Sequence, residues 1–348
     1  MALTQDIAFV HLAAGREAGA TLLRGFTTVR DVGGPAFGLK MAIDRGVVAG
    51  PRIFPSGAMI SQTSGHGDFR LLSALPRMPG DPADHTERQG VNAIADGADE
   101  VLRRAREQLM KGASQIKIHA GGGVSSPYDP LDSLQFTGRE MRSAVEAASD
   151  WGTYVCAHVY TPDGIRRCVA AGVRSIEHGQ LADEETARVM AGEGVWWSIQ
   201  PFLFDEDEDA NVRPEPEARA MQERVAEGTL RAFELGRTLG VRMAFGTDIL
   251  FNAAQGGASQ GRHLAKLARF MPPLEALRMA TGDAGELLAM SGDRAPYPAP
   301  LGVIVPGAHA DLLVVDADPE AGLDWLGNPE SSLRLIVKGG QIVKEALA

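Results

Sequence analysis

Four polar residues stand at the ends of apolar segments, where they could together hold a metal ion. They are Lys117 in Gln-Ile-Lys-Ile-His, His158 in Val-Cys-Ala-His, His178 in Ser-Ile-Glu-His-Gly and Asp248 in Ala-Phe-Gly-Thr-Asp. Imidazole nitrogen and carboxylate oxygen are ordinary ligands of Zn²⁺ and similar ions, and a catalytic ion keeps one position open for water. A single histidine at a strand end is more often only hydrogen-bonded, and Asp248 alone could cap a helix. Four such residues in strand order predict a metal site.

Lys117 has two interpretations. A lysine ammonium has no lone pair and cannot coordinate a metal ion. It becomes a bridging ligand only if carbon dioxide converts the amine into a carbamate, a step that composition and spacing do not indicate. The alternative is a buried or snorkelling lysine paired with a carboxylate. From the residue alone, both interpretations stay open.

The segments that position these residues alternate between short apolar runs and amphipathic windows. The candidate strands cover residues 26–29, 52–57, 116–119, 154–158, 173–178, 195–200 and 243–248. The candidate helices cover residues 5–23, 98–111, 137–151, 162–171, 183–191, 221–239, 264–270 and 273–290. This alternation predicts an α/β protein with parallel strands inside and helices outside, as a closed (β/α)-barrel in preference to an open doubly wound sheet. Active sites of such barrels are assembled at the carboxyl ends of the strands. The count is one strand short of eight.

The last part of the chain has a different texture. Pro- and Gly-rich turns separate brief β-type runs at residues 302–305, 311–315, 333–337 and 341–343. We therefore predict a barrel domain over residues 1–292 and the C-terminal part of a small β-sandwich subdomain over residues 293–348. The acidic run Asp205–Asp209 is interpreted as a solvated loop or, alternatively, as a lid that shapes or repels charge at the site.

Bulk properties limit the class of partner. The net charge of −11 disfavours nucleic acid and anionic membranes, because phosphate binding needs clustered Lys and Arg. Apolar stretches are interrupted well before the roughly 18 residues of a membrane span, and no leader segment is visible. We expect a cytoplasmic protein with a small-molecule or peptide substrate. Cys156 and Cys168 form no CxxC pattern and are expected to be buried small hydrophobes.

The chain resembles the amidohydrolase superfamily, in particular the imidazolonepropionase-like branch of Xaa-Pro dipeptidases, prolidases and ochratoxin-hydrolysing amidases. The resemblance runs over essentially the whole chain. Its motifs are Gly25-Phe-Thr-Thr-Val-Arg-Asp-Val-Gly-Gly34, Gly50-Pro-Arg52, Ser64-Gly-His-Gly67, Ile116-Lys-Ile118, Ala157-His-Val-Tyr160, Ser175-Ile-Glu-His-Gly179, Gly246-Thr-Asp248, Pro306-Gly-Ala-His-Ala-Asp-Leu-Leu313 and Val337-Lys-Gly-Gly340. It implies a TIM-like (β/α)8 barrel that carries a divalent metal centre.

The resemblance also implies the ligand set. Lys117 would be the carboxylated lysine that bridges two divalent ions, expected to be Zn²⁺. His158 and His178 would ligate the second ion, and Asp248 would bind metal and handle protons. These assignments follow from the resemblance and not from spacing.

Two further residues receive roles from the same resemblance. Tyr160 would polarise the scissile carbonyl, with a structural hydroxyl as the alternative. His66 would lie near the substrate's carboxylate, with bracing of the Gly-rich loop as the alternative. Arg30 and Asp31 are expected to form a structural pair.

The sequence departs from the family pattern at one important place. The family opens with a His-x-His pair on its first strand, whereas no two of the eight histidines here are two residues apart. We therefore expect the first barrel strand and its metal ligands to lie outside this sequence. A cut protein, a misplaced start codon and a naturally short chain all fit. A longer precursor could also carry an export signal.

The expected reaction is hydrolysis of an amide bond, in an Xaa-Pro dipeptide or an ochratoxin-like N-acyl amino acid, by a metal-activated hydroxide. A deaminase is less favoured, because Thr161 stands where those branches carry a glutamate. Imidazolonepropionase chemistry is less favoured because a bridging Lys117 indicates two metals. A lactonase or phosphotriesterase would use the same kind of metal centre, and only the branch motifs disfavour it. The alternative from another class is a catalytically incomplete fragment or scaffold subunit that assembles with copies of itself through an open barrel edge.

Overall fold

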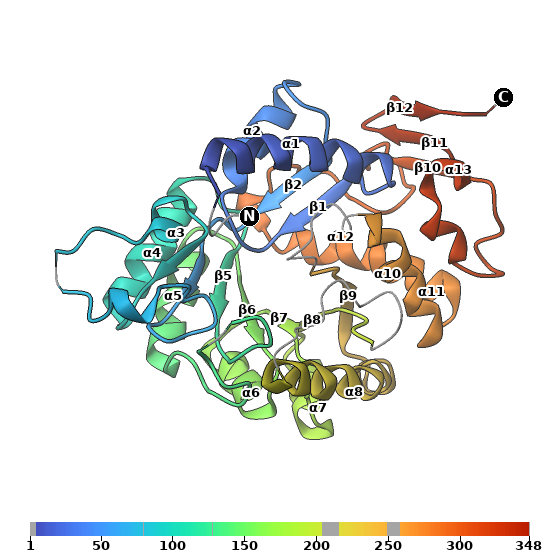
Figure 1. Ribbon diagram of the computed structural model, residues 1–348. Coiled ribbons are helices and arrows are strands. Elements are labelled where there is room, and N and C mark those ends of the chain that lie inside the picture. Colours follow the sequence, from blue (N-terminus) through green and yellow to red (C-terminus); the bar gives the residue numbers. More distant parts are fainter. Residues whose placement is uncertain (1–4, 79, 127, 204–215, 249–257, 348) are drawn as a thin grey trace.

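The computed structural model describes the chain except residues 1–4, 79, 127, 204–215, 249–257 and 348. Helices and strands alternate along it (Figure 1). The strands before residue 300 are β1 (Thr28–Asp31), β2 (Arg52–Pro55), β3 (Met59–Ser61), β4 (Asn92–Ile94), β5 (Ile116–His119), β6 (Val155–Val159), β7 (Ser175–His178), β8 (Trp196–Ile199) and β9 (Arg242–Phe245). The helices are α1 (Ile7–Leu23), α2 (Ala36–Asp44), α3 (His85–Arg88), α4 (Ala98–Met110), α5 (Gly138–Asp150), α6 (Pro162–Ala171), α7 (Glu184–Gly192), α8 (Pro216–Leu239), α10 (Gln260–Lys266), α11 (Pro273–Ala280) and α12 (Gly282–Ala289).

The strands form two parallel sheets. One has seven strands in the order β4-β3-β5-β6-β7-β8-β9, and the other is the pair β1-β2. The chain bends between β2 and β3 at Gly57, whose φ is +74°, so that β2 pairs with β1 while β3 pairs with β4 and β5. Among the strands that the structure describes, β1 pairs only with β2 and β9 only with β8. This is the arrangement that the sequence predicts for a (β/α)-barrel without its first strand.

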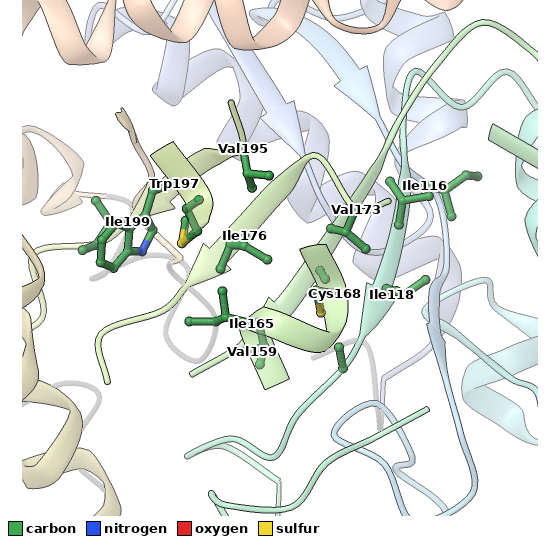
Figure 2. Packing of buried hydrophobic residues seen from close by; sticks show 14 of the residues in the cluster. Ile116, Ile118, Val159, Ile165, Cys168, Val173, Ile176, Val195, Trp197 and Ile199 are labelled. Carbon is green, nitrogen blue, oxygen red and sulfur yellow. The ribbon is translucent and has the colours of Figure 1, made fainter. Parts of the chain in front are cut away.

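Alternation along the strands separates an outer core from the barrel interior. Ile116 and Ile118 of β5 belong to the large apolar cluster that also contains Ile176 of β7 and Ile165 and Cys168 of α6, and Figure 2 shows these side chains packed between the strands and α6. Because side chains alternate along a strand, Lys117 and His119 project to the other face. The outer core therefore fixes which residues of β5 enter the barrel.

Local signals in the sequence explain where the helices around this core begin and end. Thr137 and Glu140 form a capping box at the start of α5. Pro162 occupies the first turn of α6, and Gly172 ends that helix in the left-handed conformation with φ +97°. These helices begin and end within one residue of the predicted windows.

A second, smaller cluster fills the lower barrel interior. It contains Tyr154, Cys156, Trp196, Ala244 and Leu287. Both cysteines are fully buried and free, as expected. The side chains that face the barrel axis below the strand ends are therefore largely apolar, and a charged group among them needs a partner.

Arg30 is that charged group, and its partner is not the one expected. Its guanidinium donates to Glu177 at 2.6 Å, to Tyr154 at 3.2 Å and to Ser175 at 3.3 Å. The expected pairing of Arg30 with Asp31 is wrong, because neighbours on a strand point to opposite faces. Burial opposes the charge of Glu177, but Arg30 and Lys117 outweigh it and lower the pKa of Glu177 to about 2.

The C-terminal strands form a separate antiparallel sheet. Its order is β10 (Leu312–Val315), β11 (Leu333–Lys338) and β12 (Gln341–Glu345), with α13 (Pro329–Ser332) before β11. Figure 1 shows this sheet beside the end of α1. Arg52 donates to Asp311 at 2.5 Å and Lys338 to the Gly50 carbonyl at 2.6 Å. The predicted β-subdomain is present as this sheet, and its boundary at residues 292/293 stays a prediction.

Some predicted elements need correction. Residues 302–305 are not a strand, because Gly302 turns the chain at φ +70° and Ile304 is 86% exposed. The predicted helix over residues 273–290 is two helices, α11 and α12, which meet at Thr281. The short strands β3 and β4 and the helices α2 and α3 were not predicted. The acidic run Asp205–Asp209 lies outside the described residues, and none of the described helices is long and apolar enough to cross a membrane.

The ion pair inside the barrel gives a first prediction. We expect Arg30→Met to lower the free energy of unfolding by about 3 kcal/mol, because it leaves the Glu177 carboxylate buried without its main partner. Urea unfolding followed by circular dichroism measures this loss. Arg103→Met is the matched control, because Arg103 is exposed and pairs with Glu100 and Glu107 on the surface of α4. A loss no larger than that of the control would show that the Arg30 pair does not support the barrel.

Replacement of Asp31 is expected to stabilise the protein at neutral pH, in contrast to replacement of Arg30. Burial raises the pKa of Asp31 to about 6, against one opposing hydrogen bond from the Gly33 amide. Because the folded-state pKa lies above the unfolded value of about 3.9, the contribution of Asp31 to stability falls between pH 4 and 6 and is unfavourable above pH 6. We expect Asp31→Asn to raise the free energy of unfolding at pH 7 by about 2 kcal/mol and to have no such benefit at pH 4. Denaturant unfolding at both pH values tests this, and equal effects at the two would contradict it.

Candidate functional site

Four buried histidine rings meet at the carboxyl ends of neighbouring strands. His66 follows β3, His119 ends β5, His158 lies in β6 and His178 ends β7. The ring centres of His158 and His178 are 4.6 Å apart, those of His119 and His158 are 5.2 Å apart, and those of His66 and His158 are 4.1 Å apart. The carboxyl ends of the strands are where active sites of this architecture form.

An unusual backbone conformation brings His178 into this group. Glu177 and His178 are consecutive, so a regular strand would direct them to opposite faces. His178 instead has a φ of +76°, in the left-handed region, and Gly179 follows with a φ of +73°. The indole of Trp197 donates to the His178 carbonyl at 2.6 Å. Such a conformation costs on the order of 1–3 kcal/mol in a residue other than glycine and is typical of functional sites.

The other predicted residues lie around the rings. The Asp248 carboxylate approaches the Nδ1 atom of His178 at 3.9 Å, and Asp248 also has a positive φ, +51°. The Tyr160 ring centre lies 5.2 Å from that of His158 and 5.0 Å from that of His178. Lys117 is 4% exposed, and its charge acts on His158, His178 and Glu177. The structure therefore gathers Lys117, His158, His178, Asp248, Tyr160 and His66 in one place, while their roles stay predictions.

Fixed hydrogen bonds set the tautomers of two rings. The Nδ1 atom of His178 donates to the Gln200 side-chain carbonyl at 2.8 Å, which leaves its Nε2 atom with a lone pair. The Nε2 atom of His158 donates to the Gly122 carbonyl at 3.2 Å, which leaves its Nδ1 atom with a lone pair. Bonds of this kind orient metal-binding imidazoles.

His66 is held in a different way. Its Nδ1 atom donates to Asp129 at 2.9 Å, and its Nε2 atom accepts from the Ser125 hydroxyl at 3.1 Å. A Cβ atom at Gly123 would lie 2.0 Å from the His66 ring, so this approach requires a glycine there. Both ring nitrogens of His66 are thus engaged.

Burial controls the protonation of the site. It lowers the pKa of His158 and His119 well below the ordinary histidine value, and neighbouring rings and Lys117 add to the effect. Burial also lowers the pKa of His178, although Asp248 opposes it. Burial, followed by the charges of Asp248 and Asp129, raises the pKa of Tyr160 well above its ordinary value. At neutral pH these imidazoles are neutral donors of lone pairs, and Tyr160 keeps its proton.

The donor set fits a divalent metal ion in its chemistry, and one pair of rings also fits in its spacing. Zn–N bonds of about 2.1 Å, with about 1.1 Å from nitrogen to ring centre, place the ring centres of two imidazoles on one ion about 4.5–5.2 Å apart, for angles at the ion from about 90° to the tetrahedral value. His158 and His178 are separated by 4.6 Å. Within the described part of the chain, no three His, Cys, Asp or Glu side chains already converge on a single point. The donors are therefore gathered without being closed around one centre.

The sequence did not point to three residues of this cluster. His119 lies two residues beyond Lys117 on the same face of β5, and this period-two spacing was the available signal. Asp129 and Gln200 lie outside the strands. They contact histidines 63 and 22 residues away in sequence, respectively, and no local pattern indicates such contacts.

Comparison with known proteins gives one family for the whole chain. A sequence model of the Amidohydrolase family matches residues 5–343. The ochratoxinase of Aspergillus niger is 32% identical over 331 residues, which are 93% of this chain and 66% of that protein. The chain thus spans just under two thirds of the length of this curated relative.

Solved structures agree with this result. The crystal structure of an amidohydrolase is 40% identical, with a TM-score of 0.88 over 99% of this chain and 81% of that chain. The crystal structure of a prolidase complexed with N-methylphosphonate-L-proline is 36% identical, with a TM-score of 0.87 over 99% of this chain and 82% of that chain. The α/β barrel is therefore shared over nearly the whole length of the chain.

The bond between Gln200 and His178 can be tested directly. We expect Gln200→Leu to weaken Zn²⁺ binding by about 10–100-fold, because His178 loses the acceptor that fixes its tautomer. Competition with a chromophoric chelator measures the affinity. Gln115→Leu is the control, since Gln115 is also buried but donates to the backbone carbonyls of Asp31 and Phe54. It precedes β5, at the end of that strand far from the histidines. Equal affinities for the two variants would mean that Gln200 does not orient a metal ligand.

Proposed function

The chain belongs to the amidohydrolase family, and we propose that it is a metal-dependent hydrolase of an amide bond in a dipeptide or an N-acyl amino acid. One observation carries this proposal. Two neutral imidazoles, a carboxylate, a buried lysine and a protonated tyrosine gather at the carboxyl ends of the barrel strands. Together they offer ligands, a proton carrier and a hydrogen-bond donor, which are the groups that amide hydrolysis requires.

Four residues would hold the metal. In our proposal His158, His178 and Asp248 would act as direct ligands, and Lys117 would join them as the carbamate that its neutral amine forms with carbon dioxide, with release of a proton. When bound, divalent ions, which we propose to be Zn²⁺, lower the pKa of water from about 15.7 toward 7 and polarise the scissile carbonyl. The tautomers fixed by Gln200 and the Gly122 carbonyl support His178 and His158 as ligands.

The chain's own residues would perform the remaining steps. Asp248 takes a proton from the attacking water and delivers it to the leaving amine. Tyr160 donates a hydrogen bond to the oxygen of the scissile carbonyl as negative charge develops there. Its raised pKa supports this role, because a phenol that stays protonated can donate. In our proposal His66, which Asp129 holds in place, lies near the carboxylate of the substrate.

The substrate class is supported by the relatives. One similar structure is a prolidase complexed with N-methylphosphonate-L-proline, and one similar sequence is an ochratoxinase. We therefore propose a leaving group that is an amino acid with a free carboxylate. The chain covers 66% of the ochratoxinase and contains no His-x-His, so the proposal is limited to the ligands that this sequence itself supplies.

We also propose that the chain assembles with copies of itself. Among the described strands, β1 and β9 each pair on one side only. A strand edge with free N–H and C=O groups favours association.

A panel of substrates tests the reaction. We expect protein reconstituted with Zn²⁺ to hydrolyse Xaa-Pro dipeptides or N-acyl amino acids. We expect Asp248→Asn to lower kcat by about 10²–10⁴-fold, because the proton carrier is lost. We expect Tyr160→Phe to lower kcat by about 10²-fold with little change in KM. Asp150→Asn, at the exposed end of α5, is the control that leaves both constants unchanged.

The panel is run in parallel on the chain extended at its N-terminus by a segment with a His-x-His strand. Hydrolysis by the extended form alone would make the present chain an incomplete enzyme with the residue roles intact. Cleavage of lactones or phosphotriesters in place of amides would contradict the substrate class. If neither form binds metal or hydrolyses any substrate, the chain is a scaffold and the proposal is wrong.

A further inference from the structure

We propose that the substrate carries an apolar side chain on the acyl side of its scissile bond, and that Phe202 and Met221 select this side chain. The inference rests on the proposed function and deepens it, because it concerns the same site. Three features of the structure support it. They are an apolar cluster that includes Tyr160, the partial exposure of the outer members of that cluster, and the polar surroundings of His66 on the opposite side.

Tyr160 belongs to an apolar cluster at the carboxyl ends of the strands. Its other buried members are Leu131 and Val225, and four partly buried side chains pack against them: Val124, Leu181, Phe202 and Met221. The cluster draws on the loops after β5, β7 and β8 and on α8. Burial is the first cause that raises the pKa of Tyr160. The tyrosine proposed to contact the scissile carbonyl therefore has apolar side chains beside it.

One face of α8 packs against this cluster. Met221 and Val225 are four residues apart, so they lie on the same face of the helix. Gly228 follows on that face, and a Cβ atom there would lie 2.4 Å from the carbonyl oxygen of Gln180. Gln180 lies in the loop after β7, two residues beyond His178. The helix therefore lies directly against the loop that follows a proposed metal ligand.

The outer members of the cluster are only half-buried. Val124, Leu181, Phe202 and Met221 all keep part of their surface exposed. A half-buried apolar side chain is stabilised when an apolar group of a ligand covers the rest of it. The Phe202 ring centre lies 6.4 Å from that of His178, with 16° between the ring planes. A group that covers Phe202 would thus also lie beside the proposed metal ligands.

A series of ring contacts separates Phe202 from His66. The ring centres of His66 and His158 are 4.1 Å apart, and those of His158 and His178 are 4.6 Å apart. The contact between His178 and Phe202 completes the series. His66 follows β3 and Phe202 follows β8, and three strands lie between β3 and β8 in the sheet. The two residues therefore stand at opposite ends of the cluster of rings.

The surroundings of His66 are polar. Its ring bonds to Asp129 and Ser125, and its backbone amide donates to the Gln135 side-chain carbonyl at 2.8 Å. If the carboxylate of the leaving amino acid lies near His66, as proposed above, the acyl part of the substrate extends toward Phe202. A polar side chain there would lose water without gaining a hydrogen bond from the aliphatic and phenyl groups around it. An apolar side chain would not incur this cost.

Two pairs of substrates matched in size test the inference on the unmodified chain. Leu-Pro is compared with Asn-Pro, and N-isovaleryl-L-proline with N-carbamoylacetyl-L-proline, so that only the polarity of the terminal group differs within a pair. We expect the chain reconstituted with Zn²⁺ to hydrolyse the apolar member of at least one pair with a kcat/KM about 10–100-fold higher, because that member buries an isobutyl group. Equal values within both pairs, or a preference for the polar member, overturn the inference.

Variants assign the preference to the two side chains. Phe202→Ser and Met221→Gln should each reduce the ratio of the two kcat/KM values to below about threefold, because the apolar contact is lost. The matched controls are Phe9→Ser and Met110→Gln, since Phe9 of α1 and Met110 of α4 are exposed, and both should keep the ratio of the unmodified chain. A smaller fraction of folded protein lowers both kcat/KM values equally and leaves their ratio unchanged. An unchanged ratio in both folded site variants overturns the inference.

Binding of the same pairs to the metal-free chain, measured by isothermal titration calorimetry, separates this inference from the proposed function. Binding of an apolar member at least about tenfold more tightly than its polar counterpart, without hydrolysis of either, would support the inference and contradict the proposed function. Hydrolysis of both members with equal kcat/KM would support the proposed function and overturn the inference. Neither binding nor hydrolysis of any member would overturn both.

Discussion

The site depends on the ion pair between Arg30 and Glu177, which lies in the barrel interior directly below it. Arg30 comes from β1, the strand paired only with β2, whereas Glu177 comes from β7, an inner strand of the seven-stranded sheet. The bond therefore connects the two sheets across the barrel interior. No backbone pairing between the described strands connects these two sheets. Glu177 immediately precedes His178 and stands opposite His158 in the register of β6 with β7. The same interaction that bridges the two sheets thus lies directly beside two imidazoles of the site.

Above this ion pair, regular strands and local departures from strand geometry both contribute to the site. Parallel strands deliver one inward side chain in every two residues, which accounts for Lys117, His119 and His158. His178 and Asp248 enter through positive φ angles, which cost free energy in residues other than glycine. Side-chain and loop contacts then set the rings, through Gln200 for His178 and Asp129 for His66. The regular part of the fold supplies positions, and the strained part supplies convergence.

The same division explains how far the sequence could be interpreted. The sequence predicts four site residues because each lies at or near the end of an apolar strand, and this pattern can be recognised without an alignment. They are Lys117, His158, His178 and Asp248. Tyr160 and His66 required the family resemblance, because nothing local distinguishes them from structural residues. His119 followed from period two but was overlooked. Arg30 was given the wrong partner, because its true partner lies 147 residues away. The sequence does not predict the short strands β3 and β4, and it predicts a strand at residues 302–305 where the chain turns. Segments of three or four residues carry too little periodicity for either to be recognised.

The composition of the site conflicts with stability, and this conflict bears on its function. Four imidazoles and a lysine are nearly fully buried, and the pKa values of His119, His158 and His178 are lowered because their charged forms are poorly solvated there. An apolar barrel interior would avoid both these desolvation costs and the unpaired Nδ1 atom of His119. Neutral imidazoles packed at 4–5 Å from one another have little mutual attraction, yet they are the form that binds a metal ion. A cation bound here would gain from the same burial, since a low-dielectric surrounding strengthens its interaction with every donor. The arrangement therefore supports the proposed metal site, in which a bound ion would offset the cost of burying these groups.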